Sequence, residues 1–267
     1  MQNSDRAFSG SIPALYDRYL GPLIFEAYAA DLARRLPESG AVLETAAGTG
    51  IVTAALLGTL PPTARLVATD LNQAMLDHAA TKMKAPNLAW RQADATALPF
   101  EDRSFDAVVC QFGVMFFPDK RKAHEEVRRV LKPGGRYLFN VWDRLEFNDF
   151  GRVVHEAVVG CYPSDPPGFL ARAPYGYADP AAVTDAVRAA GFERVEIESL
   201  AFQSRAPSSR DPAIGFCQGS PLRAEIEARK TKTLDEVTDA AADAIAARFG
   251  RGPIEGRIRA HVVTAMR

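Results

Sequence analysis

Residues 42–50 read VLETAAGTG, and this stretch decides the fold. Its apolar start is typical of a short buried strand that ends at a sharp turn. Gly48 and Gly50 permit backbone angles that a Cβ disfavours, and they allow a ligand to lie directly against the main chain. The apolar run at 51–57 predicts that the turn opens a helix. A strand, a glycine-rich turn and a helix N-terminus are typical of a nucleotide site in an open α/β sheet, although an ordinary tight turn shares this pattern.

Strands and helices alternate along the first half of the chain around this turn. The expected strands lie at 41–45, 65–69, 88–93, 105–111 and 136–141, and the expected helices at 50–59, 72–83 and 118–131. This alternation predicts a parallel sheet with right-handed crossovers and helices on both faces. Ligands of such sheets bind at the carboxyl ends of the strands, where Asp70, Asp94 and Gln111 fall.

The regular alternation stops after Trp142, where proline and aromatic residues become frequent. Near the N-terminus, Gly21-Pro22 predicts a break between two helices, at 12–20 and 22–35. Further helices are expected at 149–160, 180–190 and 234–249, and further strands at 194–203 and 257–265. The organisation that we expect is an N-terminal helical flap at 1–36, a cofactor-binding core at 37–143, an aromatic cleft insertion at 144–178, a continuation of the core at 179–204, a helical insertion at 205–256 and a final core strand at 257–267.

The composition argues against several classes of protein. The 267 residues are 47% hydrophobic and 24% charged with a net charge of −1, so no electrostatic footprint for nucleic acid is present. No apolar run approaches the ~20 residues of a membrane-spanning helix, and residues 1–11 lack the apolar core of a signal peptide. Three widely spaced cysteines fit a reducing compartment better than a disulfide framework. We therefore expect a cytoplasmic protein without a metal centre that neither binds nucleic acid nor spans a membrane.

The glycine pattern narrows the choice of nucleotide. The dinucleotide fingerprint G-x-G-x-x-G needs a third glycine, but Gly48-Thr49-Gly50 is followed by Ile51-Val52-Thr53. No Gly-Lys-Ser/Thr follows the turn, so a P-loop is excluded as well. The turn therefore approaches its ligand closely but carries no pyrophosphate signature.

The chain resembles the class I S-adenosylmethionine-dependent methyltransferases, and most of all the type 11 group that includes ubiquinone- and menaquinone-pathway enzymes. The resemblance covers about residues 40–143. Its motifs are ETAAGTG at 44–50, Asp70 after the second strand, Asp94 in QADA at 92–95, FDAVVCQ at 105–111 and LKPGG at 131–135. Ala46 stands in place of the first glycine of the family's G-x-G-x-G. The resemblance implies a Rossmann-like seven-stranded mixed sheet with an antiparallel C-terminal strand, helices on both faces and helical lid insertions.

The resemblance also implies S-adenosyl-L-methionine as the cofactor. Asp70 lies twenty residues beyond Gly50, where a carboxylate accepts both ribose hydroxyls. Asp94 would accept a hydrogen bond from the adenine amine, and the Ala95 N–H would donate to a ring nitrogen. The other residues assigned to this site are Glu44 for the ammonium of the methionine moiety, Ala46, Gly48 and Gly50 for the turn around that moiety, Leu71 and Met75 for the adenine face, and Gln111 near the sulfonium.

Methyl transfer from a sulfonium is an in-line displacement, which depends mainly on holding the reacting atoms ~3 Å apart and aligned. A general base is needed only when the acceptor must lose a proton. His155 in the cleft insertion and Tyr16 on the flap are the candidate catalytic residues, and Asp143 is a further candidate base. Packing or surface roles are the simpler interpretation of each. Cys110 lies in a buried strand, which disfavours thiol chemistry.

The aromatic insertion indicates that the partner is a small apolar or aromatic methyl acceptor. We interpret residues 12–28, 143–178 and part of 205–255 as a lid, although their aromatic residues would also suit a second small core or a dimer interface. Two other functions fit the motifs. One is a non-catalytic protein that binds S-adenosylmethionine or S-adenosylhomocysteine, and the other is a non-methyl transferase that would need a cationic residue for an added carboxylate. A monomer and a homodimer are both compatible with the sequence.

Overall fold

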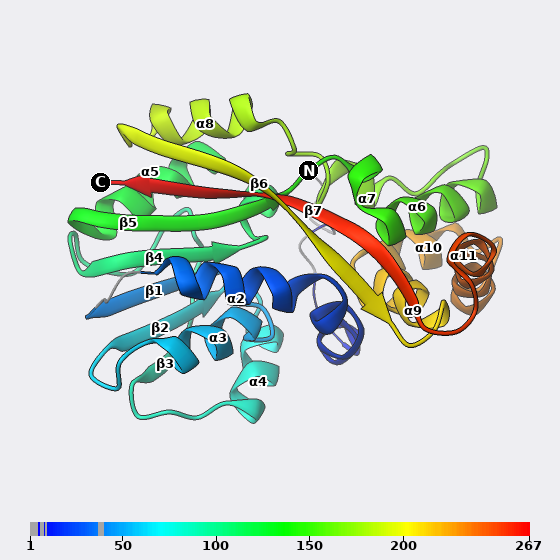
Figure 1. Cartoon of the computed structure of the whole chain (residues 1–267), viewed down its shortest axis with the longest axis horizontal. Helices are drawn as coiled ribbons and strands as arrows, with labels where there is room; N and C mark the ends of the chain where they lie inside the picture. The colour runs from blue at the N-terminus through cyan, green and yellow to red at the C-terminus, as the bar shows by residue number, and fades with distance from the viewer. Residues whose placement is uncertain (1–4, 6–7, 9, 37–39) are drawn as a thin grey trace.

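A single seven-stranded sheet forms the centre of the molecule (Figure 1). The structure is a computed structural model that describes residues 5, 8, 10–36 and 40–267. The strands are β1 (Ala41–Thr45), β2 (Arg65–Asp70), β3 (Leu88–Gln92), β4 (Phe105–Gln111), β5 (Leu131–Trp142), β6 (Arg194–Ala206) and β7 (Ile254–Met266). Their order in the sheet is β3-β2-β1-β4-β5-β7-β6. Strands β1 to β5 are parallel, and β7 runs antiparallel to both of its neighbours, so the predicted mixed sheet is confirmed.

Strands β5, β6 and β7 are each at least three residues longer than the sequence predicted. Strand β5 begins at Leu131, which pairs with Phe105 before the Lys132–Gly135 loop bulges out and pairing resumes at Arg136. Strands β6 and β7 pair continuously from Arg194↔Met266 to Ala206↔Ile254, beyond the ends predicted at 203 and 257. This ribbon extends from the sheet toward the helices on the right of Figure 1, and Ala206 and Ile254 at its outer end are buried in the larger hydrophobic core.

Helices cover both faces of the sheet. Helices α2 (Glu26–Arg35), α3 (Ile51–Thr59), α4 (Gln73–Lys82), α5 (Lys120–Val130) and α8 (Pro180–Ala189) flank it. Successive strand residues point to opposite faces, as a period of two requires. Val42 and Val109 belong to the core shared with α2 and α3, whereas Leu43 and Val108 belong to the larger core shared with α5 and α8. Both faces are apolar, which explains why the central strands read as continuous hydrophobic runs.

The N-terminal region is one continuous helical run, so the break predicted at Gly21-Pro22 is wrong. It comprises α1 (Ile12–Leu15), the π-helix η2 (Tyr16–Phe25) and α2. Pro22 lies inside η2, where the Glu26 N–H donates to the Gly21 carbonyl five residues back. The wider π turn removes the four-residue hydrogen bond that a proline ring obstructs, so the chain stays helical past Pro22.

The remaining helices gather at one end of the molecule, where β6 and β7 reach them (Figure 1). They are α6 (Asp149–Cys161), α7 (Phe169–Arg172), α9 (Arg210–Gln218), α10 (Leu222–Arg229) and α11 (Leu234–Phe249), with short 3-10 turns η3 (Val114–Phe116) and η4 (Leu145–Phe147) closer to the sheet. Thr233 and Glu236 form a reciprocal capping box at the start of α11, which fixes where this helix begins.

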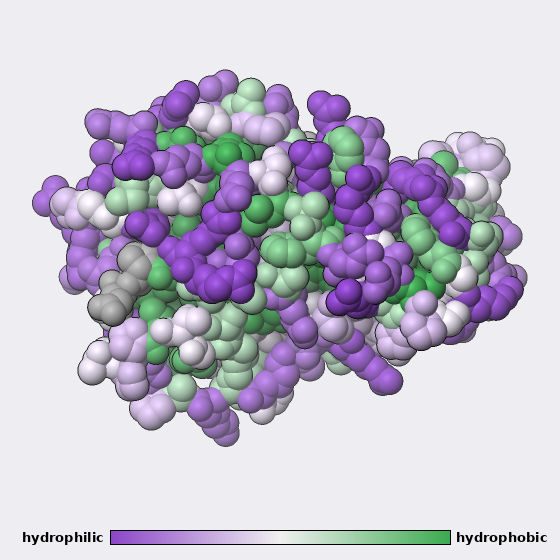
Figure 2. Space-filling view, in the orientation of Figure 1, coloured by the Kyte–Doolittle hydropathy of each residue, from purple (hydrophilic) through white to green (hydrophobic). Residues whose placement is uncertain are grey.

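Hydrophilic residues line most of the rim of the face seen in Figure 2. Among the residues that the structure describes, Leu71 is the one large hydrophobic side chain that is exposed. No helix in the described part of the chain is long and apolar enough to cross a membrane. Cys110, Cys161 and Cys217 are all free thiols.

Candidate functional site

The turn after β1 adopts left-handed backbone conformations at alternate residues. Ala46 has a φ of 53°, Gly48 of 56° and Gly50 of 83°. Such angles cost an L residue with a Cβ roughly 1–2 kcal/mol, so Ala46 holds a conformation that glycine would adopt more easily. A Cβ built on Gly48 would meet no atom within 4 Å, so the main chain here borders open space.

Gly50 packs closely against neighbouring elements. A Cβ at this position would overlap the methyl end of Met83 and lie 3.0 Å from the Trp90 ring. Gly50 is also absent from the lining of the cavity described below. This packing accounts for a glycine here, and its contact with the cofactor stays a prediction.

Asp70 connects the end of β2 to the turn after β1. Its carboxylate accepts hydrogen bonds from the backbone N–H of Gly48 at 2.9 Å and from that of Asn72 at 2.8 Å. The side chain is 7% exposed, and burial raises the pKa of its carboxyl although these hydrogen bonds oppose the rise. The Asn72 side-chain amide also donates to the oxygen that accepts from its backbone N–H, at 3.3 Å, so the oxygen that accepts from Gly48 is the one with a second lone pair for a further donor.

These residues border a cavity of about 750 Å³ at the carboxyl ends of the parallel strands. It is lined by eight of the ten residues assigned to the cofactor and by the candidate catalytic Tyr16. The eight are Ala46, Gly48, Asp70, Leu71, Met75, Asp94, Ala95 and Gln111. The structure thus brings together side chains from four strand ends, as the sheet topology requires.

The polar groups at the rim of this cavity are held in place by local bonds. One carboxylate oxygen of Asp94 accepts from both the backbone N–H and the hydroxyl of Thr96, each at 2.8 Å. No described residue bonds to the other oxygen of this exposed side chain. The Gln111 amide donates to the Phe25 carbonyl at 3.1 Å, which ties the end of β4 to the helix η2.

Glu44 and His155 lie outside this cavity. Glu44 is 1% exposed, and its carboxylate accepts from the Thr53 hydroxyl at 2.6 Å within the turn. Burial raises the pKa of Glu44 to about 8, opposed by the Thr53 hydrogen bond, and the nearby charge of Asp70 adds to the rise. His155 lies on α6 and lines neither cavity of the site, so its expected position in the cleft is not what the structure has.

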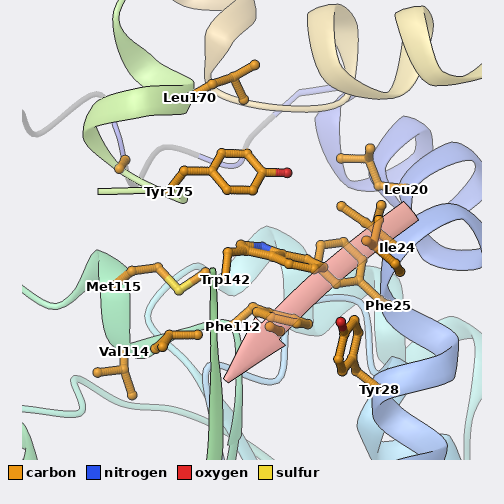
Figure 3. Close-up of a cluster of buried hydrophobic side chains, with 14 of the residues drawn as sticks. Leu20, Ile24, Phe25, Tyr28, Phe112, Val114, Met115, Trp142, Leu170 and Tyr175 are labelled. Atoms are coloured by element: carbon orange, nitrogen blue, oxygen red, sulfur yellow. The ribbon is translucent and has the colours of Figure 1, made fainter. Parts of the chain in front are cut away.

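A second cavity of about 450 Å³ adjoins the first. Phe8, Tyr16, Phe112 and Phe116 line both cavities and form their common wall. The remaining lining residues are mostly apolar and come from η2, η3, α7, α9, the end of β5 and nearby loops: Leu20, Ile24, Phe25, Met115, Trp142, Phe169, Leu170, Pro174, Tyr175, Phe216, Ser220 and Pro221. Figure 3 shows several of these side chains converging from the helix of η2 on one side and from α7 on the other.

Sequence reasoning missed most of the common wall. Phe112 follows β4 with a φ of 48° and stacks on Trp142 at 3.7 Å between ring centroids. Phe116 lies on the turn η3, and Phe8 packs edge-on against both Phe116 and Tyr16. The FGVMFF run at 112–117 was a usable signal, because an aromatic cluster directly after a strand end lies where ligands bind.

The common wall carries no ionised side chain among the residues that the structure describes. Tyr16 stacks on Phe25 at 4.9 Å between ring centroids. Burial raises the pKa of the Tyr16 hydroxyl well above its usual range, and the negative charges of Asp70 and Asp17 add to the rise. Tyr16 is therefore a neutral hydrogen-bonding group at physiological pH.

The first cavity fits the cofactor that the resemblance implies. Thr45 lines it, and its enclosed hydroxyl has no hydrogen-bond partner among the described residues. The open space at Gly48 allows a ligand to approach the main chain, while Asp70 and Asp94 keep acceptor capacity. These groups suit the hydroxyls and amines of an adenosyl amino acid.

Gly113→Ala is expected to lower the free energy of unfolding by about 1–3 kcal/mol, the usual cost of overpacking. The new Cβ would overlap that of Ala46 and lie 2.8 Å from the Cys110 sulfur, although the φ of −97° suits alanine. Urea denaturation of Gly113→Ala, of Ala46→Gly and of the double variant measures the coupling. The double variant should recover about 1 kcal/mol, because it removes the Ala46 Cβ. Strictly additive effects would contradict this contact.

Sequence comparison finds relatives that are methyltransferases. Residues 42–135 match a family described as "Methyltransferase domain". A ubiquinone/menaquinone biosynthesis C-methyltransferase of Idiomarina loihiensis is 31% identical over 172 residues, which cover 60% of this chain and 68% of that protein. The enzyme of the same description from Enterobacter sp. is 42% identical over 101 residues, 36% of this chain and 40% of that protein. The latter match spans less than half of the relative's own length.

Solved structures share the fold across nearly the whole chain. The YcgJ protein of Bacillus subtilis superposes with a TM-score of 0.56 at 19% identity, over 91% of this chain and 97% of that one. Phosphoethanolamine N-methyltransferase 2 of Haemonchus contortus, in complex with phosphomonomethylethanolamine and S-adenosylhomocysteine, gives a TM-score of 0.62 at 15% identity. That match covers 98% of this chain and 59% of the other. At these identities the likeness concerns the fold alone.

Proposed function

Because this chain belongs to the class I S-adenosylmethionine-dependent methyltransferases, in the group of the ubiquinone/menaquinone-pathway enzymes, we propose that it methylates an apolar or aromatic small molecule bound in the second cavity. One observation carries this proposal: the apolar second cavity shares an aromatic wall with the first. A donor in the first cavity and an acceptor in the second would meet at that wall.

S-adenosylmethionine, when bound, supplies a methyl group on a positively charged sulfur. Asp70 and Asp94 would accept hydrogen bonds from its ribose and adenine, and Leu71 and Met75 would cover the adenine face. Gly48 leaves the main chain accessible to the cofactor. The carboxyl group of Glu44 points to Thr53, so its proposed contact with the cofactor ammonium would run through an intervening water.

The aromatic wall has two roles in this proposal. The faces of aromatic rings attract a cation within about 6 Å of their centroids, so Tyr16, Phe112 and Phe116 suit a sulfonium at the junction. The same rings exclude water and hold the acceptor in line with the departing sulfur.

The acceptor would not rely on a strong base of the protein. Neither a carboxylate nor an imidazole lines the second cavity within the described ranges, and the neutral Tyr16 hydroxyl donates better than it accepts a proton. An electron-rich ring of the quinol or phenol type needs no such base to begin the attack. The names of the two relatives, which state carbon methylation in ubiquinone and menaquinone biosynthesis, support this class of acceptor.

Transfer of labelled methyl from S-adenosylmethionine to a panel of quinols, phenols, amines and thiols tests the proposal. We expect transfer to a quinol or phenol. A protein that binds S-adenosylhomocysteine but methylates no member of the panel would favour the non-catalytic function. A carboxylated cofactor is disfavoured, because neither arginine nor lysine is found among the described residues lining the two cavities.

Tyr16→Phe is expected to lower kcat/KM for the preferred acceptor by about 3–10-fold, the value of one neutral hydrogen bond. Affinity for S-adenosylhomocysteine should stay within about twofold, since the ring and its stacking on Phe25 are kept. Tyr19→Phe is the matched control, because Tyr19 is on the same helix but lines neither cavity. Equal losses in both variants would remove the Tyr16 hydroxyl from the proposed reaction.

A further inference from the structure

The hydroxyl of Tyr175, which lines the second cavity, has no hydrogen-bond partner among the residues that the structure describes. Tyr175 is 6% exposed, lines this cavity and lies 6.0 Å from Trp142 between ring centroids. None of the described residues makes a hydrogen bond to its hydroxyl. The hydroxyls of Tyr137, Tyr162 and Tyr177 are fully enclosed, whereas that of Tyr175 is not. In Figure 3 it points over Trp142 toward the side where Leu20 and Ile24 lie.

Neighbouring polar groups are already satisfied and do not compete for this hydroxyl. The hydroxyl of Tyr28 donates to the Leu200 carbonyl at 2.9 Å. The Ser220 hydroxyl donates to the Phe216 carbonyl at 2.6 Å and accepts from the Leu222 N–H at 3.2 Å. Tyr175 therefore offers a hydrogen bond that the protein itself does not use.

The surrounding chain leaves room for the hydroxyl. A Cβ at Gly151, in helix α6, would lie 2.7 Å from the Tyr175 oxygen and 3.2 Å from the ring carbon that carries it. Glycine within a helix is less favourable than alanine. Phenylalanine at 175 would fill the same apolar surroundings without an unpaired buried oxygen, which is itself unfavourable. A ligand that bonds to the hydroxyl would offset the cost of burying that oxygen.

We propose that Tyr175 is a specificity-determining residue that hydrogen-bonds an oxygen substituent at the non-reacting end of the acceptor. The inference rests on the proposed function, because it takes the second cavity as the acceptor site. Tyr16 lines both cavities, whereas Tyr175 lines the second alone. An acceptor with its reacting atom at the Tyr16 junction would therefore place its remote end at Tyr175. The Trp142 indole N–H lines the same cavity without a described partner, so a ligand oxygen suits this wall better than a donor-only group.

Two small probes of equal shape test the proposal: p-cresol, which has a hydroxyl, and p-xylene, which has a methyl in its place. Binding of each is measured by calorimetry or Trp142 fluorescence on protein saturated with S-adenosylhomocysteine. Tyr175→Phe should lower the affinity for p-cresol by about 3–10-fold and should leave the affinity for p-xylene within about twofold of the wild type. Tyr177→Phe is the control, because Tyr177 is two positions along the chain, its hydroxyl is enclosed and it lines neither cavity. This variant should change the affinity for neither probe.

A second variant covers the case in which Tyr175→Phe does not fold. Gly151→Ala displaces the Tyr175 hydroxyl. Like Tyr175→Phe, it should lower the affinity for p-cresol relative to that for p-xylene. A crystal structure of the wild type with p-cresol should place its oxygen within hydrogen-bond distance of the Tyr175 hydroxyl. The proposal would be overturned if Tyr175→Phe lowered the affinities for both probes equally. It would also be overturned if the p-cresol oxygen were bound away from the Tyr175 hydroxyl. Failure of S-adenosylhomocysteine to bind would instead count against the proposed function.

Discussion

Replacing Asp70 by alanine is expected to weaken S-adenosylhomocysteine binding by about 10²- to 10⁴-fold. Two hydrogen bonds from ribose hydroxyls to a carboxylate contribute about 1.5–3 kcal/mol each, and every 1.4 kcal/mol is tenfold in affinity. The turn adds to the loss, because Asp70 also accepts the backbone N–H of Gly48 and of Asn72. Without these hydrogen bonds, the Asp70 side chain no longer stabilises the left-handed conformation of Gly48.

Titration calorimetry measures the change, and Asp77→Ala is the matched control. Asp77 lies on α4 close to the site, but it is exposed and accepts only from Gln73 at 2.7 Å. Asp70→Asn separates the two causes, since an amide has one acceptor oxygen and two donors in place of a carboxylate. The affinity of Asp70→Asn for S-adenosylhomocysteine should lie between those of the wild type and Asp70→Ala. Unchanged affinity in Asp70→Ala would remove this residue from the cofactor site.

His124 is expected to make the wild-type protein lose about 3 kcal/mol of stability between pH 7.5 and pH 4, relative to His124→Leu. The side chain is fully buried on α5 against Tyr137 and Phe139, and neither ring nitrogen has a described partner. Burial lowers the pKa of His124 to about 4 from its usual 6.5, and the charge of Lys120 adds to the decrease. Each unit of pKa corresponds to about 1.4 kcal/mol.

The sign follows from proton binding. Between pH 6.5 and 4 the unfolded chain carries a proton on His124 that the folded chain does not, so the free energy of unfolding falls as the pH falls. Urea denaturation of wild type and His124→Leu at several pH values isolates this effect, because the other titrating groups are common to both. At pH 7.5 the variant should be more stable by about 1–3 kcal/mol, since it removes two unpaired buried nitrogens. Parallel pH profiles would show that His124 is already paired.

The sheet was predictable because its strands carry their own signal. Three apolar runs end at Thr45, Asp70 and Gln111, and each is long enough to form a strand. The chain between them is long enough to form crossover helices, which is what parallel pairing requires. The direction of β7 came from the family resemblance and not from any residue pattern. Eight of the ten predicted cofactor residues lie together because strand order alone brings their strand ends to one edge.

The remaining features depend on contacts that a local pattern does not contain. Gly50 was assigned to the ligand, but it packs against Met83, more than thirty residues later. The carboxylate of Glu44 points to Thr53. The side-chain rotamer decides this direction, and the position of Glu44 in the motif does not reveal it. The helix persists past Pro22 because a π turn accommodates the ring. His155 does not reach the cleft because no residue of α6 lines either cavity.

The ribbon of β6 and β7 has a consequence for how such an enzyme changes over evolutionary time. The pair Ala206↔Ile254 closes the ribbon, and residues 207–253, with α9 to α11, leave and return at that single point. Insertions, deletions and substitutions between these anchors leave the register of β6 on β7 intact, and with it the scaffold that carries Asp70 and Gly48. Phe216 and Ser220, which line the second cavity, lie within this exchangeable segment. A lineage with this architecture can therefore diversify its acceptors by replacing one contiguous stretch of its gene while inheriting its cofactor chemistry unchanged.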